Sequence, residues 1–244
     1  MKKLRTILCA VSVLILTSIT TSPLIAADGS NFAGPYVGFQ MNAVGVELDG
    51  EATSGRDDVG ETTTGSVGKT AIIGGLELGY VVPLGDGGVL LDVGLSYIAG
   101  GAKITGKNTD TEAVADVIFE VDDLYTGWIA PSFALSDTSS AFLKVGYSYA
   151  AVSLTGDVAQ VDDMEGVTAA IGTRTVLESG LFIKSEAGIT QFDKIATVGL
   201  GKGGGAGCTD AASAGCASKS VETSTNVSAT PTVAYGSISI GMRF

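Results

Sequence analysis

The sequence alternates between apolar residues and small or polar residues, and this two-residue period constrains the fold more than any other feature. In the second of the alternating segments, Ile72, Leu76 and Leu78 share one face, and Glu77 lies on the other with several glycines. Residues two apart share one face of a β-strand, and each glycine would cost a helix about 1 kcal/mol relative to alanine. We therefore predict eight strands, at residues 34–46, 70–82, 89–99, 124–135, 141–154, 167–177, 181–192 and 233–244.

The connections between these segments alternate in length. Long ones cover 47–69, 100–123, 155–166 and 193–232, whereas short ones cover 83–88, 136–140 and 178–180. Long loops on one side and tight turns on the other are typical of outer-membrane barrels; a soluble sandwich or lipocalin has no reason to segregate them. We predict an all-β fold: an eight-stranded antiparallel transmembrane up-and-down β-barrel with long extracellular loops and short periplasmic turns. Its expected location is the cell outer membrane of a Gram-negative bacterium.

The N-terminus has the layout of a secretory signal peptide. Lys2, Lys3 and Arg5 precede a mostly apolar stretch, and small residues follow at Ala26 and Ala27. A retained membrane helix is the alternative, but the apolar stretch is shorter than the ~20 residues that a spanning helix needs. We expect residues 1–27 to be a cleaved signal peptide and residues 28–244 to form the outer-membrane β-barrel domain.

Composition excludes several classes of function. The chain contains no histidine, which removes Ser-His-Asp catalysis, Cys-His catalysis and His-ligated zinc. Its net charge is −12, which disfavours nucleic-acid binding because phosphate contacts need clustered Lys and Arg. We therefore expect neither an enzyme nor a cofactor nor a nucleic-acid partner.

The stretch "GSVGKT", residues 65–70, ends like a phosphate-binding loop. The full pattern needs a glycine where this chain has Thr63, a strand before the loop and a helix after it. A polar run precedes Lys69 and an alternating segment follows it. We interpret the stretch as the end of a loop that re-enters a barrel.

Charged residues within the alternating segments all lie on the small-residue face. A Lys or Arg that faced lipid near mid-membrane would cost roughly 2–4 kcal/mol, whereas inward-facing charges can pair. Ordinary solvated positions on a soluble sheet are the alternative interpretation. An eight-stranded barrel has room only for side chains in its interior. We therefore predict a packed, balanced set of barrel-interior charges: Glu77, Asp92, Lys144, Arg174, Lys184 and Glu186.

The opposite face carries aromatic residues that suit the interfacial girdles of a membrane barrel. They are Tyr80, Tyr97, Tyr125, Phe133, Tyr147 and Tyr149. In the fourth segment we expect Tyr125, Ile129, Phe133 and Leu135 to face outward. Pro131 cannot donate a ladder hydrogen bond, so a local irregularity or bulge is expected beside it.

Two cysteines follow the expected signal peptide, Cys208 and Cys216, both in the last long connection. An even pair in an oxidising compartment predicts a disulfide bond. Two free thiols are the alternative.

The C-terminus, "SISIGMRF", alternates and ends on an aromatic residue. Ile238, Ile240, Met242 and Phe244 share one face and resemble the assembly signal that the barrel-assembly machinery recognises. With "GPYVGFQMN" near the start, the chain resembles the opacity-protein-like family of small, porin-like eight-stranded barrels, over essentially all of residues 33–244.

The resemblance implies contact with outer-membrane lipid and lipopolysaccharide, and it leaves function open. We expect a non-enzymatic surface protein, a scaffold whose acidic extracellular loops serve envelope integrity or meet host or surface ligands. A narrow porin that passes small solutes is the alternative.

Overall fold

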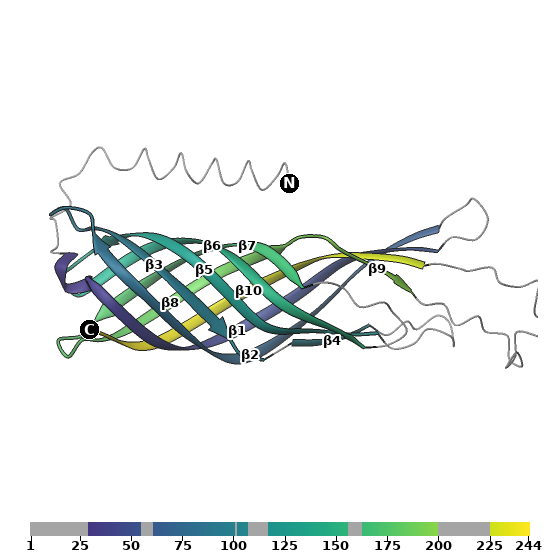
Figure 1. Ribbon diagram of the computed structural model, residues 1–244, viewed down its shortest axis with the longest axis horizontal. Helices are drawn as coiled ribbons and strands as arrows, with labels where there is room; N and C mark the ends of the chain where they lie inside the picture. The colour runs from purple at the N-terminus through teal and green to yellow at the C-terminus, as the bar shows by residue number, and fades with distance from the viewer. Residues whose placement is uncertain (1–28, 55–60, 101, 107–116, 156–162, 200–224) are drawn as a thin grey trace, which may run out of the picture.

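The computed structural model describes residues 29–54, 61–100, 102–106, 117–155, 163–199 and 225–244, and these residues form a closed barrel of tilted strands (Figure 1). A short 3₁₀ turn, η1 (Gly29–Phe32), precedes the strands. The strands are β1 (Gly34–Ser54), β2 (Glu61–Pro83), β3 (Val89–Ile98), β4 (Ala102–Gly106), β5 (Val117–Ala134), β6 (Ser139–Thr155), β7 (Met164–Val176), β8 (Leu181–Phe192), β9 (Ile195–Gly199) and β10 (Thr225–Arg243).

The ten strands make eight positions around the barrel wall, as the sequence predicts. Strand β4 continues β3 along the side of β5, and β9 continues β8 along the side of β10. Every pairing is antiparallel, and β1 pairs with β10, from Tyr36 opposite Arg243 to Ser54 opposite Thr225, which closes the barrel. Within the described residues, no helix is long and apolar enough to cross a membrane.

The outer wall is apolar. Phe39 is 69% exposed and Ile72 is 77% exposed, and most of the large apolar residues predicted to face outward are exposed as well, whereas Tyr97 is half-buried. An apolar surface of this extent around a closed barrel is stable only in lipid, because a soluble protein rarely exposes an apolar patch of more than a few hundred Å². The barrel therefore lies in a membrane, and the fold is that of the outer membrane.

The strands extend further than the sequence predicts at the end of the barrel where the long connections lie, which we call the loop end. Residues 47–54 and 61–69 continue the β1–β2 ladder up to Ser54 opposite Glu61, so most of the predicted loop 47–69 is strand. Residues 117–123 and 225–232 likewise belong to β5 and β10. Alternation does not reveal these parts, because β-branched polar residues such as those at 62–64 favour strands without marking an apolar face.

The GKT sequence lies inside β2, where Lys69 pairs with Val46 of β1. Strand continues on both sides of it, so the helix that would bind phosphates is absent from this described stretch. The interpretation as part of a barrel wall holds, although the residues are strand and not the end of a loop.

The irregularity expected at Pro131 is an interruption of the β5–β6 ladder and not a bulge. The β5–β6 ladder skips Ala130 and Pro131 without a shift in register. The register shift occurs instead between Asp122 and Leu124, where Asp123 has a φ of 24°.

Candidate functional site

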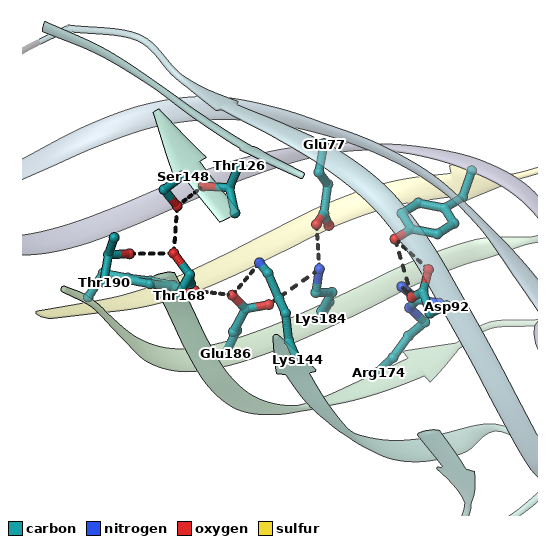
Figure 2. Close-up of polar contacts among 12 residues, drawn as sticks. Glu77, Asp92, Thr126, Lys144, Ser148, Thr168, Arg174, Lys184, Glu186 and Thr190 are labelled. Atoms are coloured by element: carbon teal, nitrogen blue, oxygen red, sulfur yellow. Dashed lines mark hydrogen bonds and ion pairs between the residues drawn. The ribbon is translucent and has the colours of Figure 1, made fainter. Parts of the chain in front are cut away.

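The barrel interior holds the residues that could carry a function. All six charged residues predicted to face inward do so, and all are buried (Figure 2). Along β8 the inward side chains follow in the order Phe182, Lys184, Glu186, Thr190 and Phe192. The charges therefore form a middle layer between two apolar layers. We call this layer the ion-pair belt: Glu77, Asp92, Lys144, Arg174, Lys184 and Glu186.

The belt charges pair across the lumen. Arg174 of β7 reaches Asp92 of β3, with 2.5 Å between Nη2 and Oδ2. Lys144 of β6 reaches Glu186 of β8, with 2.7 Å between Nζ and Oε1. Lys184 of β8 pairs with Glu77 of β2, and its Nζ also lies 3.5 Å from Glu186 Oε2. Apart from the Lys184–Glu186 contact within β8, the paired strands are not neighbours in the sheet. The other three pairs therefore act as struts between separate parts of the wall.

Aromatic rings surround the belt on the side of the short turns, which we call the turn end. The Nζ atoms of Lys144 and Lys184 each lie 5.0 Å from the ring centroid of Trp128. The guanidinium of Arg174 lies 4.4 Å from the ring of Tyr36. These distances allow cation–π attraction in a site that is shielded from water.

Two tyrosines also bind the belt directly. The Tyr36 hydroxyl donates to Asp92 at 3.1 Å, and the Tyr235 hydroxyl donates to Glu186 at 2.6 Å. Sequence reasoning assigned no role to these aromatics or to Trp128. The signal was available, because Tyr36, Trp128 and Tyr235 have the strand parity of the small-residue face and not of the apolar face.

Glycines on the inner wall make room for the large inward side chains. A Cβ on Gly172 would overlap the ring of Phe142, and one on Gly241 would overlap the ring of Phe182. The indole of Trp128 lies over Gly94 in the same way. The inner wall of the turn-end half thus leaves room for aromatic rings, and this accounts for part of the 35 glycines in the chain.

A row of hydroxyls lies beside the belt toward the loop end (Figure 2). Thr126 and Ser148 are 2.8 Å apart, Ser148 and Thr168 are 2.5 Å apart, and Thr168 and Thr190 are 2.7 Å apart, each between hydroxyl oxygens. The row crosses β5, β6, β7 and β8. Because each hydroxyl can donate to the next, these buried polar groups are satisfied within the wall.

The loop-end half of the interior is apolar. We call it the loop-end compartment, and its buried residues are Val44, Val46, Ile98, Val121, Leu124, Ala150, Met164, Phe192 and Val233. A small cavity of 20 Å³ lies among them, and Gly100 lines it. The wall is irregular here, because β3 ends at Ile98, β4 begins at Ala102, and β5 has its register shift at Asp123.

The remaining predicted site residues fall into two groups. Ile238, Ile240, Met242 and Phe244 lie on the outer face at the C-terminus, all exposed, with Phe244 following the β10 ladder. Cys208 and Cys216 lie outside the described residues, so their disulfide stays a prediction. Among the residues that the structure describes, no group of three or more His, Cys, Asp or Glu side chains could hold a metal ion.

Two solved structures share this architecture. The outer membrane protein OprG from Pseudomonas aeruginosa superposes with a TM-score of 0.55 at 12% sequence identity, covering 87% of this chain and 97% of OprG. The outer membrane protein AlkL, solved in DMPC lipid bilayers, gives a TM-score of 0.51 at 12% identity, covering 87% of this chain and 90% of AlkL. No family model and no curated protein sequence matches the chain. The likeness shows the fold, and the chain is an eight-stranded β-barrel of the outer-membrane type.

Proposed function

We propose that this chain is a non-enzymatic surface barrel with a sealed lumen, a scaffold that holds its loop-end strands and loops at the outer surface. The observation that carries the proposal is the ion-pair belt, in which two struts join strands that have two other strands between them around the barrel and the third bridges over β7. A pore for polar solutes needs a continuous aqueous path, and paired, buried charges packed among rings oppose one.

Packing on both sides of the belt supports the seal. Tyr36, Trp128, Phe142 and Phe182 are buried on its turn-end side, and the loop-end compartment lies on its other side. Water would have to pass two apolar layers as well as the belt. An eight-stranded barrel has no spare width to bypass them.

The outer rim at the loop end supports a role at the surface. The Tyr97 hydroxyl donates to Asp123 at 2.8 Å, and the Tyr147 hydroxyl donates to Glu165 at 2.5 Å. Tyr97 also stacks on Tyr125, with 4.9 Å between ring centroids. The rings suit the boundary between lipid and water, and they hold carboxylates where a cationic ligand, or a divalent cation bridging to lipopolysaccharide phosphate, would approach.

Single-channel recording in planar bilayers tests the seal. We expect the refolded wild-type protein to produce no discrete current steps. Arg174→Ala should lower stability without producing a stable, selective pore. Reproducible steps from the wild type, with an ion selectivity that changes in Arg174→Ala, would show that Arg174 lines a conducting path and would favour the narrow porin.

A second function, passage of small apolar molecules from the outer surface into the membrane, is favoured by the loop-end compartment. Its apolar lining and cavity lie beside the break between β3 and β4, so a path through the side of the wall would bypass the belt. Uptake of a small aromatic hydrocarbon by cells that produce the protein tests this. Leu124→Asn should reduce uptake, whereas Arg174→Ala should not; equal uptake with and without the protein would exclude it.

A further inference from the structure

The segment Gly29–Gly34 lies across the turn-end mouth of the barrel. Figure 1 shows η1 at this end, close to the C-terminus. Phe32 is only 1% exposed, and it belongs to the same buried cluster as Val81, Leu90 and Ala134, whose side chains point into the barrel. The Phe32 ring is therefore part of the interior, although it precedes the first strand.

The path of the segment is tightly fixed. A Cβ on Gly29 would lie 2.8 Å from Leu90 Cδ2. Gly34 has a φ of 113°, a conformation that favours glycine, and a Cβ there would lie 2.7 Å from the carbonyl oxygen of Phe244. The segment thus depends on glycine at Gly34, and at Gly29 it packs closely against the Leu90 side chain.

Hydrogen bonds fasten the segment to separate parts of the mouth. Asn31 Nδ2 donates to the carbonyl oxygen of Asp137, in the β5–β6 turn, at 3.1 Å. Arg243 Nη1 donates to the carbonyl oxygen of Ala33 at 3.1 Å, and the Phe244 backbone N–H donates to Pro35 at 2.9 Å. The bond to Ala33 joins the segment to the end of β10, and the bond to Pro35 of β1 lies beside it, where the first and last strands meet.

We infer that Gly29–Gly34 is a stopper that closes the turn-end mouth and fastens the seam between β1 and β10. It forms a second barrier in series with the ion-pair belt, and this inference rests on the proposed sealed lumen. The stopper shields the interior around Ala134 from solvent at the turn end. The belt shields the interior around Ala170, which is opposite Lys144 in the sheet.

Thiol labelling can separate the two barriers. Ala134→Cys and Ala170→Cys replace buried, inward-facing alanines, and each is made with Cys208→Ser and Cys216→Ser so that it carries the only thiol after signal removal. The refolded barrel in detergent micelles is treated with a small, charged methanethiosulfonate reagent. With Phe32 intact, we expect both thiols to be nearly unreactive. Phe32→Ala should raise the labelling rate at residue 134 several-fold and leave the rate at residue 170 unchanged.

The other outcomes contradict one barrier or the other. If residue 134 reacts equally fast with and without Phe32, or stays unreactive in a folded Phe32→Ala barrel, the stopper is wrong. If residue 170 reacts while Phe32 is intact, the belt does not seal and the proposed function fails, whatever happens at residue 134. Heat-modifiable mobility shows that each variant has folded, and Asn31→Ala, which removes one fastening and no ring, should increase labelling less than Phe32→Ala.

Discussion

The two halves of the barrel interior are built by the same strands and filled in different ways. In the turn-end half, rings and paired charges fill the space up to glycines in the wall. In the loop-end half, the described buried side chains are apolar and leave a small cavity. The number of strands around the barrel is the same in both halves, so the size and charge of the inward residues decide where the lumen is closed.

The largest expected effect comes from breaking a strut of the turn-end half. Arg174→Met would leave the Asp92 carboxylate buried without its cation, and removing one partner of a buried pair costs about 3–5 kcal/mol. Arg174→Met combined with Asp92→Leu should recover most of this loss, because no lone charge remains. Urea unfolding in lipid vesicles, followed by fluorescence of Trp128, the single tryptophan, measures both. A double variant as unstable as Arg174→Met would mean that the pair is not the unit of stability.

A smaller effect is expected from filling the space that the glycines leave. Gly172→Ala would place a Cβ against the Phe142 ring and the Ser185 carbonyl. Because backbone cannot yield as a flexible side chain does, overpacking should cost about 1–3 kcal/mol. Gly74→Ala is the matched control, since nothing lies within 4 Å of its Cβ position, and it should be neutral or slightly stabilising. Equal stability of the two variants in the same unfolding assay would show that the turn-end half is not packed to its wall.

The outer face of the barrel could be predicted from the sequence, because lipid favours an apolar residue at every second position. The same parity placed all six belt charges inside. Which charges pair could not be predicted, since the stagger of the strands decides that Lys184 of β8 meets Glu77 of β2. Alternation also fails at the loop end, where the extensions of β1 and β2 are mostly polar or small residues, so the sequence predicts a loop there.

The aromatic rings and the stopper were missed for a different reason. The sequence predicts aromatic residues on the outer face, where Tyr147 is exposed, but Trp128 and Phe182 are buried in the interior. Phe32 precedes the first alternating segment, so no periodicity marks it. Phe32 joins the buried cluster that contains Leu90 because the chain crosses the turn-end mouth.

The smallest expected effect compares one substitution in both halves. Val81, in the turn-end half, is 1% exposed, and Val46, in the loop-end compartment, is 3% exposed. Val→Ala removes the same two methyl groups at each site and loses about 1.5 kcal/mol of transfer free energy. The cost of the space left behind depends on how well the surroundings can collapse.

Rings and struts hold the surroundings of Val81 rigidly, whereas Val46 borders an existing cavity. Val81→Ala should therefore lose up to about 1 kcal/mol more than Val46→Ala in the same urea titration. An equal or larger loss at Val46 would mean that the loop-end compartment is as tightly packed as the turn-end half, and it would remove the structural ground for a path for apolar molecules through that compartment.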